Sequence, residues 1–233
     1  MKILVTGGAG FIGSHVVDAF IDNGHEVVVI DNLITGREEN INPKATFYKL
    51  DIRDDKVAEI FEKEKFDIVD HHAAQMDIRR SVEDPTFDAQ NNILGTINLM
   101  QASIKNGVKK FIFISTGGAI YGEQDYFPAD EEHPTRPLSP YGITKLTGEK
   151  YLYFYAHTYG LNYVILRYAN IYGPRQNPHG EAGVVAIFTT KLLAHEQPVI
   201  NGDGTQTRDY VYVSDVVEAN LKALNYDKND VFN

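Results

Sequence analysis

The sequence predicts an α/β protein built on a doubly wound parallel sheet. Short β-branched runs alternate with segments of helical periodicity, a glycine-rich turn joins the first run to the first helix, and an acidic residue ends the second run. Of the 233 residues, 43% are hydrophobic and 23% are charged. This ordinary globular composition supports a sizeable core and excludes collagen-like, disordered and low-complexity classes.

The expected elements follow one another along the chain. The first part has strands at Ile3–Val5, Val27–Ile30, Thr46–Leu50 and Phe66–Val69, with helices from about Phe11 to Asn23 and around Val57–Phe61. The second part has a long helix after Pro85, a strand at Lys110–Ser115, a helix from Ser139 and Pro140 to about Tyr159, and a strand at Tyr163–Arg167. Each strand is a short β-branched or aromatic run, and the helices show apolar residues at helical spacing or open with a capping Ser and Pro.

Two stretches break the alternation. Residues 117–140 are rich in Gly, Pro and acidic side chains and are too long for a simple connector, so we expect a functional loop. After residue 168 the density of Pro and Gly rises again. We therefore expect a cofactor-binding domain at about residues 1–168 and part of a smaller substrate-binding region at 169–233, with interleaved chain segments.

Charge and cysteine content exclude several classes of function. The chain has 22 Lys and Arg against 32 Asp and Glu, a net charge of −10, which disfavours nucleic acid and anionic membranes as partners. There is no cysteine, which excludes disulfides, thiolate zinc sites and cysteine nucleophiles. No signal peptide or membrane-spanning run is visible, so we expect a soluble, cytoplasmic protein. We expect no metal site either, because the adjacent His71 and His72 would point to opposite faces of a strand.

A glycine-rich turn follows the first strand directly. Gly7, Gly10 and Gly13 have the spacing G-x-x-G-x-x-G and lead into a helix that starts with Phe11 and Ile12. Without Cβ atoms the backbone can approach a pyrophosphate, whose charge is favourable at the positive N-terminus of the helix. The alternative is a tight strand-to-helix turn without a ligand, but the strand before it and the helix after it favour a dinucleotide site.

Acidic residues end the next two strands. Asp31 follows Gly13 by 18 residues, where a carboxylate can accept hydrogen bonds from the adenosine ribose and repel a 2′-phosphate. We therefore expect the protein to bind NAD rather than NADP. We also expect Asn32, the next residue, to contact the cofactor. Asp51 and Ile52 could border the adenine, although Asp51 could equally open the following helix.

Tyr141 and Lys145 are four residues apart at the start of a predicted helix, so they share one face. A nearby ammonium favours the phenolate and lowers the pKa of a tyrosine, which makes Tyr141 a candidate general base. Alone, such a pair is more often a surface pair. Because a dinucleotide-binding turn precedes this pair in the sequence, we favour a catalytic role for Tyr141 and Lys145 over a surface pair.

Several segments together resemble the nucleotide-sugar branch of the extended short-chain dehydrogenase/reductase family, and most closely its UDP-glucose 4-epimerases. They are TGGAGFIG at residues 6–13, Asn92-x-x-Gly95-Thr96, STGGAIYG at residues 115–122, and the Tyr141 and Lys145 pair. The resemblance implies a Rossmann fold, tightly held NAD and epimerisation at C4 of a UDP-hexose through a transient 4-keto sugar. Tyr141 would take the proton of the 4-hydroxyl, and Lys145 would also contact the nicotinamide ribose.

The catalytic hydroxyl of the family departs from the usual pattern here. Counting back from Tyr121 places Gly117 at its position, so we expect Thr116 to supply the hydroxyl, with Ser115 as the second choice. Dehydratases and decarboxylases of the family need acidic residues just after this hydroxyl, where Gly117 and Gly118 stand. This favours epimerisation over those reactions, and the Tyr141 and Lys145 pair favours an enzyme over a non-catalytic NAD-binding sensor.

The resemblance also assigns further site residues. At the cofactor it places Ala73, Asn92, Ser115 and Tyr168. On the substrate side it places Asn170, Val184 and Arg208, the last at the diphosphate unless Arg208 pairs with Asp203 or Asp209. Residues 180–188 are expected to open a helix near the nucleotide.

Two expectations concern assembly and extent. The run Tyr151–Tyr155 makes its helix apolar on more than one face, and family members dimerise through such a helix, so we expect a homodimer unless the C-terminal region covers it. The chain ends within what resembles the family's FNIG segment, so it resembles a truncated version. The resemblance places further diphosphate contacts, and the residue that sizes the pocket for N-acetylated sugars, in the missing part.

Overall fold

A seven-stranded parallel sheet forms the centre of the molecule in the computed structural model, which describes residues 1–178 and 183–233. The strand order is β3-β2-β1-β4-β5-β6-β9, and it confirms the predicted fold class. The strands are β1 (Lys2–Thr6), β2 (Glu26–Asp31), β3 (Thr46–Lys49), β4 (Ile68–His71), β5 (Lys110–Thr116), β6 (Asn162–Tyr168) and β9 (Asp230–Phe232). The order reverses between β1 and β4, and ligands of such sheets bind at the carboxyl ends of the strands at this point.

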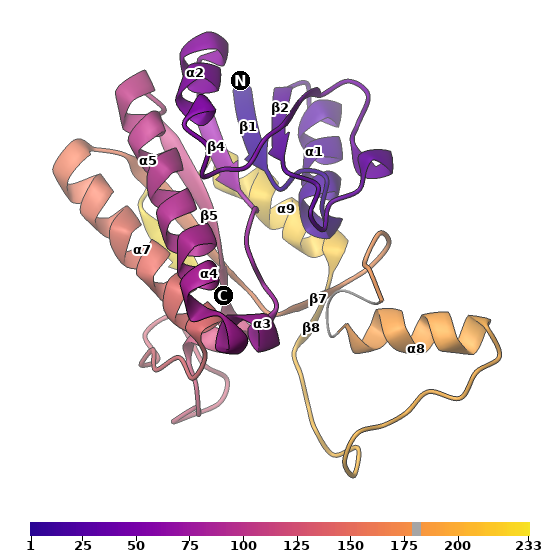
Figure 1. The fold of residues 1–233 in the computed structure, drawn as a ribbon. Helices are drawn as coiled ribbons and strands as arrows, with labels where there is room; N and C mark the ends of the chain where they lie inside the picture. Colours follow the sequence, from indigo (N-terminus) through magenta and orange to yellow (C-terminus); the bar gives the residue numbers. More distant parts are fainter. Residues whose placement is uncertain (179–182) are drawn as a thin grey trace.

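Helices cover both faces of the sheet (Figure 1). One layer contains α2 (Lys56–Glu64), α5 (Gly95–Asn106) and α7 (Pro140–Tyr159), and the other contains α1 (Phe11–Asp22) and α9 (Val213–Leu224). Alternate side chains of β5 point to opposite faces of the sheet. Phe111 and Phe113 pack in the hydrophobic core under α2, α5 and α7, and Ile112 and Ile114 pack in the core under α1 and α9. In the described part of the chain, no helix combines the length and hydropathy needed to cross a bilayer.

The shorter elements lie around the carboxyl end of the sheet. They are α3 (Ile78–Glu83), α4 (Pro85–Ala89), a π-helical turn (Gln90–Leu94), α6 (Gly117–Ile120), α8 (Val184–Leu193), a 3-10 turn (Glu38–Asn40), β7 (Asn170–Tyr172) and β8 (Tyr210–Tyr212). The last two form a separate parallel pair. In Figure 1, α8 and the segment that follows it extend away from the central sheet.

Some boundaries differ from the sequence predictions. The strand expected at Phe66–Val69 is β4, which begins two residues later because Asp67 turns its carboxylate to the backbone N–H of Lys2, 2.9 Å away. The long helix expected after Pro85 is divided into α4, the π-helical turn and α5. The loop expected at residues 117–140 opens with the short helix α6.

The end of the described chain returns to the main sheet. β9 pairs in parallel with β6, and α9 packs against α1. The buried ammonium of Lys110, at the start of β5, donates to the carbonyl oxygens of Ala223 at 3.0 Å and Leu224 at 2.7 Å, in the last turn of α9. A cation is favourable at this end of a helix. Residues 213–232 thus contribute to the layers of the first region, and the domain boundary near residue 168 stays a prediction.

Candidate functional site

The glycine-rich turn after β1 brings backbone segments closer together than side chains would permit. Gly7 has a φ of 71°, and a Cβ atom there would lie 2.7 Å from the backbone nitrogen of Ala73. A Cβ atom at Gly13 would lie 2.4 Å from the carbonyl oxygen of Gly7. Both positions therefore require glycine. The turn places the start of α1 against the carboxyl ends of β1 and β4.

The N-terminus of α1 has free capacity for an anion. Gly10 is the N-cap residue and has no side chain to cap the helix, and its N–H donates to the carbonyl oxygen of Gly7 at 3.0 Å. The N–H groups of Phe11, Ile12 and Gly13 belong to the first turn, which has no acceptors within the helix. They carry the positive end of the helix dipole, so the predicted residues fit a pyrophosphate.

Asp31 ends β2 beside this turn and is only 8% exposed. Its Oδ2 accepts the N–H of Ala9 at 3.0 Å, and its Oδ1 accepts the N–H of Leu33 at 2.8 Å. Burial raises the pKa of Asp31, and these two hydrogen bonds oppose the shift. Each carboxylate oxygen keeps acceptor capacity, so the residue fits a pair of ribose hydroxyls.

Asn32 and Asp51 contact each other at the ends of neighbouring strands. Asn32 Nδ2 donates to Asp51 Oδ2 at 2.9 Å, and Arg53 Nε donates to Asp51 Oδ1 at 2.8 Å. The bond from Arg53 is the main reason that the pKa of Asp51 falls to about 2. The N-cap of α2 is Asp55, so Asp51 does not open that helix. Ile52 is buried in the core below the strand ends.

A chain of hydrogen bonds fixes the end of β4. The Thr96 hydroxyl donates to the Asn92 carbonyl oxygen at 2.7 Å and must then accept from His71 Nε2, 2.9 Å away. The other ring nitrogen, Nδ1, accepts from the Thr6 hydroxyl at 2.7 Å, and Thr6 Oγ1 accepts the N–H of Ala73 at 3.3 Å. Burial lowers the pKa of His71 well below its usual value. A neutral ring therefore holds Ala73 beside the glycine-rich turn.

Asn92 lies in the π-helical turn, a feature that is frequent at functional sites. Its side-chain amide makes two hydrogen bonds to the backbone of Gln75. Oδ1 accepts the N–H of Gln75, and Nδ2 donates to the carbonyl oxygen of Gln75, both at 2.8 Å. Asn92 therefore positions the loop after β4, next to Ala73.

The first turn of α7 carries the predicted pair. Ser139 caps the helix by accepting the N–H of Gly142 at 3.1 Å, and Pro140 occupies the first position. Tyr141 follows and is partly buried, whereas Lys145, one turn later, is only 4% exposed. The helix thus begins as the sequence predicted and presents both residues at the carboxyl end of the sheet.

Lys145 is an ammonium enclosed by protein. Its Nζ donates to the carbonyl oxygen of Ile114 at 2.9 Å and lies 5.0 Å from the centre of the Phe113 ring. Burial lowers the pKa of Lys145 to about 8, and the negative charges of Asp88 and then Glu149 oppose the shift. The side chain is therefore mainly charged at neutral pH and can favour a nearby phenolate.

Ser115 and Thr116 end β5, and as neighbours on a strand they point to opposite faces. The Ser115 hydroxyl donates to Glu149 Oε1 at 2.5 Å, and Glu149 Oε2 is paired with Arg167 Nη2 at 2.8 Å. Thr116 is the N-cap residue of α6, and its hydroxyl makes no capping bond. The hydroxyl of Ser115 is thus committed to a buried ion pair, which favours Thr116 as the catalytic candidate.

Tyr168 and Asn170 lie at the far side of the site. Tyr168 is 8% exposed, its hydroxyl accepts a hydrogen bond from Asn220 of α9, and its ring is 6.4 Å from that of His72. Burial raises the pKa of Tyr168 well above its usual value. Asn170 is exposed in β7, where its N–H donates to the carbonyl oxygen of Asp209 at 3.0 Å.

The remaining substrate-side candidates lie apart from the main sheet. Val184 is the first residue of α8, while residues 180–182 of the same prediction lie outside the described residues. Arg208 is exposed, and among the described residues it forms no ion pair with Asp203 or Asp209. Its Nη1 donates to the carbonyl oxygen of Thr207 at 2.6 Å, and the charge of the guanidinium suits a phosphate.

The structure gathers most of the predicted cofactor residues and Tyr141, Lys145 and Thr116 at the carboxyl end of the sheet. Sequence reasoning missed a group of polar residues behind them: the buried Asp88, Thr144, Glu149 and Arg167, and the partly buried Gln75. One signal was available: Glu149 follows Lys145 by one helical turn and shares its face. Within the residues that the structure covers, no three His, Asp or Glu side chains are grouped to hold a metal ion.

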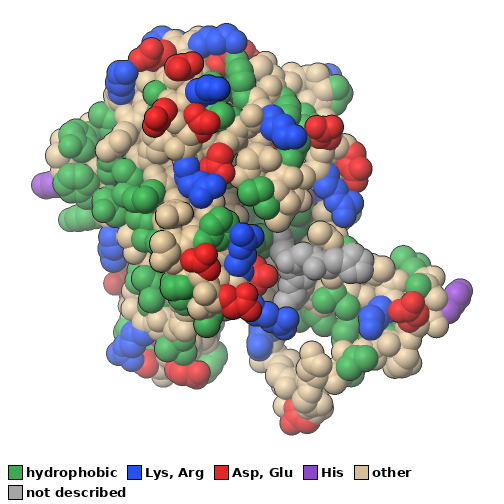
Figure 2. Space-filling model, in the orientation of Figure 1, with side chains coloured by type: hydrophobic (Ala, Val, Ile, Leu, Met, Phe, Trp, Pro, Cys, Tyr) green, Lys and Arg blue, Asp and Glu red, His purple; other side chains and the backbone are tan. Residues whose placement is uncertain are grey.

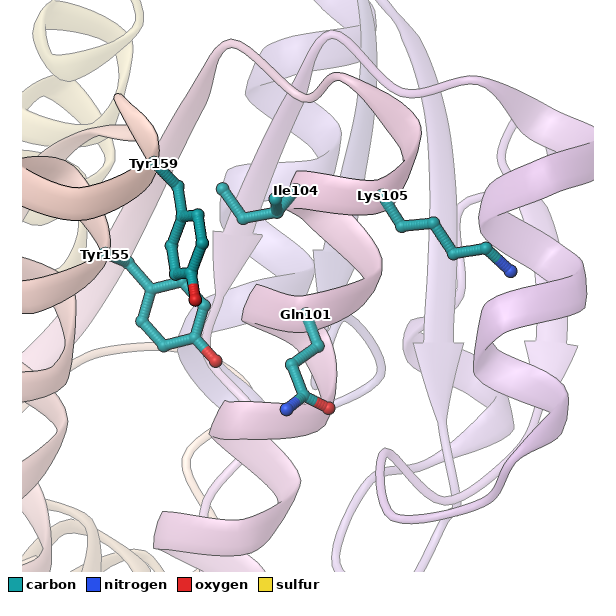
Figure 3. A pocket seen from close by; sticks show the side chains of 5 residues that line it. All are labelled: Gln101, Ile104, Lys105, Tyr155 and Tyr159. Carbon is teal, nitrogen blue, oxygen red and sulfur yellow. The ribbon is translucent and has the colours of Figure 1, made fainter.

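A second surface feature lies on α7. Tyr153, Phe154 and Tyr159 are 66%, 47% and 54% exposed, and Figure 2 shows hydrophobic side chains gathered over this helix at the left edge of the molecule. A hollow of about 230 Å³ lies between α5 and α7 (Figure 3). It is lined by Gln101, Ile104, Lys105, Tyr155 and Tyr159.

Comparison with known proteins adds independent findings. The model of the "NAD dependent epimerase/dehydratase family" matches residues 3–233. The crystal structure of UDP-glucose 4-epimerase with UDP-glucose from Thermotoga maritima is 56% identical, with a TM-score of 0.98 over 100% of this chain and 76% of that one. The Thermus thermophilus UDP-glucose 4-epimerase in complex with NAD is 48% identical, with a TM-score of 0.94, over 100% and 77%. The UDP-glucose 4-epimerase of Mycolicibacterium smegmatis is 46% identical over 96% of this chain and 73% of its own.

Proposed function

The chain belongs to the NAD dependent epimerase/dehydratase family, and from this premise we propose that it interconverts UDP-glucose and UDP-galactose by epimerisation at C4. One observation carries the proposal: a pyrophosphate-binding turn and the Tyr141 and Lys145 pair lie at the same end of one sheet. A non-catalytic sensor has no need of that pair. Gly117 and Gly118 offer no acid, which disfavours a dehydratase or decarboxylase.

NAD fits the residues present. Gly7, Gly10 and Gly13 allow a tight turn in which a Cβ atom would meet neighbouring backbone atoms, so the N–H groups at the start of α1 can face a pyrophosphate, and Asp31 offers acceptors for the ribose. Bound there, NAD supplies a reversible acceptor for the hydride on C4 of the sugar. The proposed contacts of the cofactor with Ala73, Asn92 and Tyr168 are supported by their positions: Ala73 follows β4, Tyr168 ends β6, and Asn92 in the π-helical turn holds the loop after β4.

The catalytic roles follow from charge and position. Tyr141 as a phenolate takes the proton of the 4-hydroxyl and later returns it, and the Lys145 ammonium favours that phenolate. Thr116 orients the hydroxyl of the sugar. Asn170, Val184 and Arg208 hold the sugar and the diphosphate, for which an exposed guanidinium is suited.

The preference for NAD is expected to depend on Asp31. Replacing Asp31 by Ala removes the ribose acceptor and the charge that repels a 2′-phosphate, so the ratio of NADP to NAD dissociation constants should fall at least about tenfold, or about 1.4 kcal/mol. Calorimetric titration of both nucleotides measures it. Asp22→Ala, on the last turn of α1, is the control and should leave the ratio unchanged. Equal binding of the two nucleotides by the unaltered protein would contradict the proposal.

The substrate range requires its own test. The protein is incubated separately with UDP-galactose and UDP-N-acetylglucosamine, and the products are separated by chromatography. Formation of UDP-glucose from UDP-galactose is the expected result. If only the N-acetylated sugar reacted, the proposed substrate would be wrong while the reaction class would stand.

We also propose that the protein is a homodimer joined along α7. The exposed rings of Tyr153, Phe154 and Tyr159 form an apolar surface of the kind that marks an interface. Sedimentation at micromolar concentration should show a dimer, and Phe154→Glu should shift it to monomer. Phe127→Glu, at an 80% exposed position elsewhere, should not. A protein that sediments only as monomer would argue against this assembly.

A further inference from the structure

Asp88 is a buried carboxylate without a charged partner. It lies in α4, is 0% exposed, and accepts hydrogen bonds from Gln75 Nε2 at 2.9 Å, Asn92 Nδ2 at 3.2 Å and the Thr144 hydroxyl at 2.8 Å. All three donors are neutral, and among the described residues Asp88 forms no ion pair. Burying such a charge is costly unless the surroundings use it.

The three donors connect separate parts of the site. Gln75 belongs to the loop after β4 that also carries Ala73, and Asn92 belongs to the π-helical turn. Thr144 lies on the first turn of α7, directly before Lys145 and three residues after Tyr141. One carboxylate therefore ties the cofactor edge of the sheet to the turn that carries the proposed base.

The charges around Lys145 single out Asp88. On the helix of Lys145, Glu149 faces the ammonium, but Arg167 already balances its charge, at 2.8 Å and 3.1 Å. Glu149 also accepts a hydrogen bond from the Ser115 hydroxyl. His71 of β4 also faces Lys145, but the lowered pKa of His71 leaves its ring neutral.

Tyr141 is the other titratable group on the same turn, and β5 contributes only the ring of Phe113 and the carbonyl of Ile114. Of the two carboxylates that oppose the lowered pKa of Lys145, Asp88 has the larger effect, and among the described residues it is the one that forms no ion pair.

We propose that Asp88 is a positioning residue, which fixes the first turn of α7 against the loop after β4 and keeps the Lys145 ammonium charged at neutral pH. The inference rests on the proposed function, because it assigns Lys145 a part in catalysis. It adds a residue that neither touches the sugar nor belongs to the glycine-rich turn.

The test measures the protonation of Lys145 directly, in the full chain with NAD. Lysine is labelled with ¹³C at Cε, and the Lys145 signal is assigned by its loss in Lys145→Met. Its titration midpoint should lie at about 8 and should fall by about one pH unit in Asp88→Asn, the size expected on losing a nearby opposite charge. Asp84→Asn, at the exposed N-cap of the same helix, should leave the midpoint in place.

A second variant separates charge from position. Thr144→Val keeps the charge of Asp88 and removes the hydroxyl that bonds to Asp88 and also contacts Asn92 Nδ2 at 3.2 Å and the Tyr141 carbonyl oxygen at 3.0 Å. It should therefore lower kcat for UDP-galactose without moving the midpoint, and Thr144→Ser, which keeps the hydroxyl, should restore kcat. In Asp88→Asn, the alkaline limb of the pH profile of kcat/KM should shift to lower pH, together with the titration midpoint of Lys145. If Asp88→Asn does not fold, Asp88→Ser, which is smaller and equally neutral, carries the same prediction.

An unchanged Lys145 midpoint in a folded, neutral variant at position 88 would overturn the inference, whatever the activity. A midpoint that falls as expected, in a protein that binds NAD but does not convert UDP-galactose, would support the inference about charge and count against the proposed function. The two failures are therefore distinguishable.

Discussion

Replacing Tyr141 by Phe is expected to lower the turnover of UDP-galactose by about 100-fold or more, the usual range for losing a general base. The change removes one hydroxyl from the first turn of α7 and leaves the glycine-rich turn and Asp31 as they are. Binding of NAD, measured by calorimetry, should therefore be unchanged. The measurement is the initial rate of UDP-glucose formation at saturating substrate.

Thr116→Val serves as the comparison for Tyr141→Phe. If Thr116 only orients the sugar hydroxyl, its loss should reduce turnover by less than the loss of Tyr141. Near-normal turnover in Tyr141→Phe would show that the base has been assigned wrongly, and an unaltered protein without turnover that binds NAD would favour the sensor.

The substitution Gly13→Ala is expected to have the largest effect on cofactor binding. A Cβ atom would lie 2.4 Å from the carbonyl oxygen of Gly7, a backbone atom that cannot swing away as a side chain could. The start of α1 must then move, together with the N–H groups that face the pyrophosphate. The dissociation constant of NAD should rise about 100-fold, which corresponds to about 3 kcal/mol and the upper range for overpacking.

Gly107→Ala is the matched control. Gly107 ends α5 with a φ of 73°, and a Cβ atom there would meet nothing within 4 Å. This variant should lose about 1 kcal/mol of stability through its left-handed backbone while binding NAD normally. Urea unfolding of both variants separates general destabilisation from damage to the site, and NAD binding by Gly13→Ala at normal affinity would argue against the pyrophosphate site.

The features predicted correctly from the sequence are those with a local cause. Buried parallel strands such as Lys110–Thr116 read as continuous apolar runs, since both faces are covered. The capping Ser139 and Pro140 set the start of α7 within a few residues. The glycine-rich turn forms between β1 and α1 as its spacing predicts, while the role of Asp31 at the ribose stays a prediction.

The features that were missed depend on distant partners. The short strand β9 exists because Asp230–Phe232 pairs with β6, and nothing in the three residues signals it. The π-helical turn reflects bonds between Asn92 and Gln75, 17 positions apart. Asp88 is a polar residue with no sequence signal of its own, and its burial at the site depends on contacts with Gln75, 13 positions earlier, and Thr144, 56 positions later.

The most direct test of the central claim is the number of UDP-glucose molecules formed for each NAD bound. The protein is loaded with one equivalent of NAD, given excess UDP-galactose, and followed by product chromatography and by absorbance of the reduced nicotinamide. An epimerase returns the hydride to the sugar, so we expect many molecules of UDP-glucose for each NAD and no accumulation of the reduced form. One reduced nicotinamide for each sugar consumed, or UDP-galactose recovered unchanged from the NAD-loaded protein, would contradict the account.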